Sequence, residues 1–139
     1  MRITLFQVDE ANTLLAEVRP LLERLRKRKL AFDRMETRHA VLRMAAQGAA
    51  EANPDAVELR MFLDKRARLA RVIGRGIAEL TEMGVLVKDL DTGLCDFYAL
   101  KGDRLVCLCW RADEPEIAHW HALDAGYTGR QPLKNAELG

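Results

Sequence analysis

The residues most suggestive of chemistry are two histidines, His119 and His121, which flank Trp120. On a β-strand, residues two apart point to the same face and lie about 6.6–6.8 Å apart. Two imidazoles in that arrangement can share one divalent metal ion, with a carboxylate completing the ligand set. The same pair could instead form hydrogen bonds with backbone or acidic groups and bind no metal.

Acidic residues near these histidines supply candidate ligands. Asp96 lies among apolar residues of a predicted strand, where an acid needs a specific partner because burial raises its pKa and costs stability. We expect that partner to be Arg111 or His121. Glu114 and Glu116 belong to an acidic cluster that could bind a cation or act as acid and base, although solvated turns also contain such clusters.

Two hypotheses use these residues. In one, His121, Asp96 and Glu116 hold a divalent metal in a hydrolase-like enzyme. Serine is absent from the chain, which excludes a serine nucleophile. In the other, which we favour, the chain is a binding or accessory protein whose ligand the sequence does not identify. Its arginines would suit a small anionic ligand, and its tryptophans could line a pocket. The predicted ligand-binding residues are Asp96, Trp110, Arg111, Glu114, Trp120 and Arg130. The tryptophans could equally be anchors of the core.

The cysteines indicate a reducing environment. Cys95, Cys107 and Cys109 are an odd number, and the one-residue gap between the last two is not the C-x-x-C spacing of zinc sites. We expect them to be small buried hydrophobic residues. The N-terminus lacks the apolar stretch of a signal peptide, and no apolar run reaches the roughly 18–20 residues that span a membrane. We therefore expect a cytoplasmic protein that does not bind membranes.

Charge divides the chain into two halves. Residues 1–75 carry 16 Lys and Arg against 10 Asp and Glu, whereas residues 76–139 carry 6 against 11. The basic runs Arg24–Lys29 and Lys65–Arg75 could contact phosphates, so nucleic-acid binding is a third hypothesis. Interspersed acids and the lack of interleaved aromatics favour a solvated face.

Periodicity predicts the elements that must position these residues. Apolar residues at helical spacing predict a helix from about residue 8, kinked near Pro20, and a second helix that begins with Asn53 as N-cap and Pro54 as first residue. Gly84 should end the second helix. The two helices should form an antiparallel hairpin over residues 8–84. They bury only one seam, so we expect a homodimer.

The remainder, residues 85–133, predicts a compact β-containing segment. Residues 94–100 and 105–111 form a β-hairpin, and residues 117–123 are a third strand or a short helix, with strand preferred. Residues 125–132 are expected to be a loop and 134–139 a tail. The predicted fold is a single α+β domain, residues 1–139, with an antiparallel sheet of two to three strands.

A resemblance to a known family rests on motifs along most of the chain. Leu5–Leu15, Leu108–Arg111, Trp120-His121 and Gly129–Pro132 resemble the uncharacterised bacterial family called domain of unknown function 2203. The resemblance implies long helices followed by a motif-rich segment, and it brings no established activity. It centres on the Trp-His pair, with an aromatic more usual at position 119, and so gives His121 more weight than His119. Together these observations favour a small dimeric binding or accessory protein.

Overall fold

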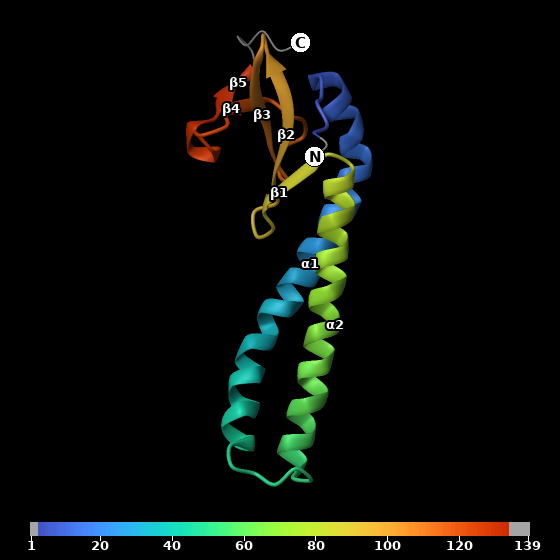
Figure 1. Ribbon diagram of the computed structural model, residues 1–139, viewed down its shortest axis with the longest axis vertical. Coiled ribbons are helices and arrows are strands. Elements are labelled where there is room, and N and C mark those ends of the chain that lie inside the picture. The colour runs from blue at the N-terminus through green and yellow to red at the C-terminus, as the bar shows by residue number, and fades with distance from the viewer. Residues whose placement is uncertain (1–2, 134–139) are drawn as a thin grey trace.

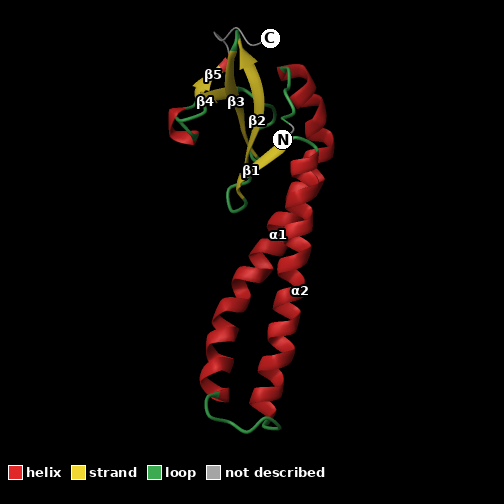
Figure 2. Cartoon of the chain, viewed as in Figure 1, coloured by secondary structure: helices red, strands yellow, loops and turns green. Residues whose placement is uncertain are grey.

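The computed structural model describes residues 3–133 and contains two helices followed by an antiparallel sheet (Figures 1 and 2). The elements, in chain order, are α1 (Val8–Ala46), α2 (Pro54–Glu82), β1 (Val85–Asp89), β2 (Leu94–Lys101), β3 (Arg104–Arg111), β4 (His119–Ala122), the short 3-10 helix η1 (Tyr127–Gly129) and β5 (Gln131–Pro132). The predicted α+β class is confirmed. The predicted 134–139 tail lies outside the described residues.

The helical hairpin forms as the sequence predicted. The Asn53 side chain accepts a hydrogen bond of 2.8 Å from the backbone N–H of Asp55, which caps α2 before Pro54. Gly84 ends α2 with a φ of 92°, a conformation that costs glycine little. The first helix runs unbroken through Pro20. Figure 1 shows that the far halves of both helices extend well beyond the sheet.

The prediction of two to three strands is wrong, because the sheet has five, in the order β1-β2-β3-β4-β5. The third predicted strand is confirmed as β4. Two strands were not expected: β1 follows α2 directly, and β5 pairs with β4 through Trp120 opposite Gln131. The segment expected to be a loop therefore contains η1 and a two-residue strand.

Strand alternation gives the sheet two different faces. The inner face packs against the helices, and its buried residues are Val85, Cys95, Phe97, Ala99, Val106, Leu108 and Trp110. They form one core with residues from α1 and α2, such as Leu15, Leu22 and Leu80. The outer face points away from the helices and carries Asp96, Tyr98, Cys107, Cys109, His119 and His121. The outer face thus holds most of the residues capable of chemistry.

Arginine side chains of α1 also form hydrogen bonds with the loops that connect the strands. Arg19 donates to the backbone oxygens of Glu114 and Pro115, at 2.8 and 2.6 Å. Arg26 donates to those of Leu90 and Asp91, at 3.1 and 3.0 Å. Part of the basic run in α1 therefore holds the β1–β2 turn in place. No helix within residues 3–133 is long and apolar enough to cross a membrane.

Candidate functional site

A buried carboxylate–imidazole pair lies on the outer face. Asp96 on β2 and His121 on β4 are 2% and 3% exposed, and the imidazole Nε2 lies 3.1 Å from both carboxylate oxygens. The other ring nitrogen, Nδ1, lies 2.8 Å from the backbone oxygen of Ala122. Of the two partners expected for Asp96, the structure places His121 beside it, whereas Arg111 pairs with Asp113 instead.

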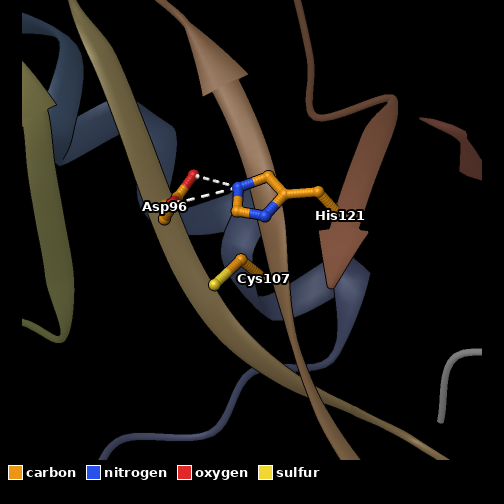
Figure 3. Close-up of side chains that lie close together, drawn as sticks. All are labelled: Asp96, Cys107 and His121. Atoms are coloured by element: carbon orange, nitrogen blue, oxygen red, sulfur yellow. Dashed lines mark hydrogen bonds and ion pairs between the residues drawn. The ribbon is translucent and has the colours of Figure 1, made fainter. Parts of the chain in front are cut away.

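Cys107 on β3 is the third member of this group. One ligand atom from each of Asp96, Cys107 and His121 can be chosen so that all three lie within 4.8 Å of one another. The strand register explains the convergence. Cys107 on β3 is directly opposite His121 on β4, and Asp96 lies on the same face of β2, which pairs with the other edge of β3. Figure 3 shows the three side chains pointing toward one another from neighbouring strands. We call them the Asp96–Cys107–His121 cluster.

The cysteines are free and buried, as the sequence predicted. Burial, reinforced by the negative charge of Asp96, raises the pKa of Cys107 and of Cys109 to about 11. Burial raises the pKa of Cys95, on the inner face, to about 12. All three are therefore protonated thiols at neutral pH and are poor nucleophiles without a cation to stabilise the thiolate.

Next to the cluster, Glu114 and Arg130 form a two-point ion pair. Arg130 donates to both carboxylate oxygens at 3.0 and 2.6 Å, and the Arg130 and Glu114 side chains are only 14% and 16% exposed. Burial opposes ionisation of Glu114, but hydrogen bonds from Arg130 and from the backbone N–H of Arg111 outweigh it and hold the Glu114 pKa below its usual value. The pair fixes the segment before β5 against the end of β3.

Tyr127 contacts two arginines that belong to this network. The guanidinium carbons of Arg130 and Arg111 are 4.6 and 5.7 Å from the Tyr127 ring centre, and Arg111 also donates to the tyrosine hydroxyl at 2.7 Å. Arg111 is itself paired with Asp113, at 2.6 and 3.0 Å. Both arginines that we expected to hold an anion are thus engaged with protein groups, and they position Tyr127 at the wall of the site.

The two tryptophans lie apart from the cluster. Trp110 is completely buried on the inner face, where its indole N–H donates to the backbone oxygen of Glu114 at 3.0 Å. Trp120 also packs against the inner core, with the ammonium of Lys101 4.8 Å from its ring centre. The six predicted ligand-binding residues therefore do not line one pocket. They are divided between the two faces of the sheet.

Two other predicted residues, His119 and Glu116, lie outside the cluster that contains His121. His119 shares the outer face with His121, but its Nδ1 lies 3.6 Å from Glu114 and it is not part of the cluster. Glu116 is exposed in the β3–β4 connection and is likewise outside the cluster. Of the predicted metal ligands, the structure brings together His121 and Asp96, with Cys107 where Glu116 was expected.

A cavity of about 260 Å³ opens beside the cluster. Besides the cluster itself, it is lined by Lys88, Leu94, Tyr98, Leu123, Gly126 and Tyr127. The sequence reasoning missed Cys107 as a partner of His121, and it missed Lys88 and Tyr127 altogether. Alternation along the strand predicted that Cys107 and Cys109 share one face of the sheet. It could not predict that Cys107 lies opposite His121, because that depends on the register between β3 and β4.

Comparison with known proteins supports the family resemblance. Residues 4–133 match the family model described as "Uncharacterized conserved protein (DUF2203)", and the chain therefore belongs to this family. No curated protein and no solved structure matches the chain. The family description assigns no activity, so the geometry of the cluster is the basis for a function.

Proposed function

We propose that this DUF2203 protein binds a divalent transition metal of the zinc class through Asp96, Cys107 and His121. Imidazole, thiolate and carboxylate are the three ligand types that zinc takes in proteins. Three protein ligands leave at least one coordination position for a further ligand, as in sites that act on small molecules rather than purely structural ones. The cavity beside the cluster can supply that ligand.

The observation that carries this proposal is the environment of His121. Both ring nitrogens face acceptors, because Nδ1 faces the Ala122 oxygen and Nε2 faces the Asp96 carboxylate. A neutral imidazole has only one N–H, so it can satisfy one of them. Either a second proton or a cation must lie between Nε2 and the carboxylate. The nearby sulfur of Cys107 favours a cation, since a simple ion pair makes no use of it.

Distances and supporting contacts fit the same assignment. Neighbouring ligands of a tetrahedral zinc lie about 3.3–3.8 Å apart, given metal–ligand bonds of about 2.0–2.3 Å. The separation of 3.1 Å between Nε2 and each carboxylate oxygen is already close to this range. The contact from Nδ1 to the Ala122 oxygen is the type of bond that orients metal-binding histidines.

Zinc and cobalt titrations test the proposal. We expect stoichiometric zinc binding by calorimetry, and, for cobalt, a thiolate-to-metal charge-transfer band together with the visible bands of a tetrahedral ion. Cys107→Ala should abolish the charge-transfer band. Cys95→Ala, on the inner face, and Cys109→Ala, on the same strand, are matched controls that should keep it. A folded protein that binds neither metal would leave only a hydrogen-bonded Asp96–His121 pair and overturn the proposal.

A second candidate function is self-association of the hairpin. Among the described residues, the far halves of the two helices leave several large apolar side chains exposed: Leu30, Val41, Met44, Val57, Met61 and Leu63. A second copy packing there would bury them in a four-helix arrangement. We propose a homodimer on this basis. Sedimentation velocity should show a dimer that Met61→Lys dissociates and that Glu17→Lys, at the sheet end of α1, leaves intact; a wild-type monomer at all concentrations would contradict it.

Hydrolase-like activity and nucleic-acid binding have less support. Hydrolysis would require the metal first, and it would also require an acid or base beside the metal ligands. For nucleic-acid binding, several basic side chains of the hairpin already have partners, such as Arg38 with Glu58 and Arg66 with Glu36. The metal site on the outer face is therefore the function that we favour.

A further inference from the structure

The cavity beside the cluster combines one cationic wall with apolar walls. Lys88 and the cluster contribute the charged part, whereas Leu94, Leu123 and the rings of Tyr98 and Tyr127 contribute the rest. At about 260 Å³ it is slightly smaller than the roughly 300–1,000 Å³ typical of drug-sized pockets. These walls suit a small molecule with both an anionic and an apolar part.

Lys88 lies at an irregularity in the sheet. The register between β1 and β2 shifts between Val87 and Asp89, which makes Lys88 the extra residue of a β-bulge. β-Bulges are frequent beside functional sites. Here the bulge coincides with a lysine that lines the cavity. An anionic ligand in the cavity would give this lysine a partner.

The charge of the filled site indicates the charge of its ligand. A divalent ion held by the Asp96 carboxylate, the Cys107 thiolate and a neutral His121 is electrically neutral. Lys88 then adds one positive charge to the wall of the cavity. A singly charged anion restores neutrality, whereas a doubly charged phosphate would leave excess negative charge in a partly buried site.

We propose that the cavity binds a small organic carboxylate, which coordinates the metal through one oxygen and pairs with Lys88. Its apolar part lies against Leu94, Leu123 and Tyr127. This inference rests on the proposed metal site and adds to it the class of ligand and the residue that selects for negative charge. Arg111 and Arg130 then have an indirect role, since they hold Tyr127 at the wall of the cavity.

Calorimetry with benzoate as the probe tests this inference on the zinc-loaded full chain. Benzoate should bind, and benzyl alcohol, a neutral molecule of similar shape, should bind roughly tenfold or more weakly because it lacks the ion pair. Lys88→Met should weaken benzoate binding by a similar factor, while the variant still binds zinc. Lys101→Met is the matched control, because Lys101 lies over Trp120 rather than at the cavity, and it should change neither.

The outcomes separate the two proposals. Zinc binding without benzoate binding, or benzoate binding that Lys88→Met does not weaken, would overturn the carboxylate site and leave the metal site standing. Equal benzoate binding to metal-free protein would overturn the coordination of the ligand by the metal. Tighter binding of inorganic phosphate than of benzoate would overturn the assignment of a singly charged carboxylate. A chain that binds no zinc would instead defeat the proposed function itself.

Discussion

The two faces of the sheet are built from the same strands yet bury opposite kinds of residue. On the inner face, Phe97 and Trp110 are buried against the helices in an apolar core. On the outer face, Asp96 and His121 are almost as deeply buried, although α1 and α2 pack against the opposite face. Among the described residues, Asp96 is the only buried carboxylate and His121 the only buried imidazole. Burial on the inner face thus stabilises the fold, whereas burial on the outer face costs free energy and indicates a function.

The largest expected effect is a loss of folding stability on the inner face that leaves zinc affinity unchanged. Phe97→Ala should lower the free energy of unfolding by about 3–5 kcal/mol, because it removes a fully buried ring that packs edge-on against Phe6 with ring centres 5.4 Å apart. Zinc affinity should not change, since the inner face takes no part in the cluster. Urea unfolding and zinc calorimetry measure the two quantities. If the variant does not fold, Phe97→Leu allows the same comparison, and a large loss of zinc affinity there would show that the faces are not independent.

A smaller loss of stability is expected on the outer face, together with loss of binding. Asp96→Asn should lower the metal-free stability by about 1–3 kcal/mol, because a charge-assisted contact to His121 becomes a neutral one. Zinc should then no longer raise the melting temperature, whereas it should raise that of the wild type. Thermal unfolding with and without zinc measures both. An unchanged zinc-induced shift in Asp96→Asn would remove this residue from the ligand set.

The Glu114–Arg130 pair predicts acid sensitivity. The pKa of Glu114 is lower in the folded than in the unfolded protein, so its contribution is present above the usual glutamate pKa and is lost as the pH falls through the folded value. Glu114→Gln should lower stability at neutral pH by about 1–2 kcal/mol and make its decline in acid less steep. Urea unfolding over a pH series measures this. Parallel curves for the two proteins would show that the pair does not contribute.

The smallest effect concerns the far end of the hairpin. Asn53→Ala removes the cap of α2 and should lower stability by about 1 kcal/mol. The site lies at the other end of the molecule, so zinc affinity should be the same as in the wild type (Figure 1). Altered zinc binding in this variant would reveal coupling between the hairpin and the sheet.

Local sequence patterns were enough to predict the helical hairpin and the central strands. They did not predict the features that depend on which strands pair and in which register. Asn53-Pro54 and Gly84 mark the limits of α2 by their own chemistry. β5 has two residues, one of them Pro132, and exists only because β4 lies beside it. Sequence neighbours were also misleading, since Trp110 and Arg111 point to opposite faces. The partnership of Cys107 with His121 depends on the register between two strands, which no local pattern contains.

Zinc binding by the wild-type chain and by His121→Ala tests the central claim most directly. Calorimetry on chelator-treated protein should show a stoichiometric zinc ion bound by the wild type, and no such binding by a His121→Ala variant that remains folded by circular dichroism. Wild-type protein that stays folded and takes up no zinc would contradict the claim that the outer face is a metal site.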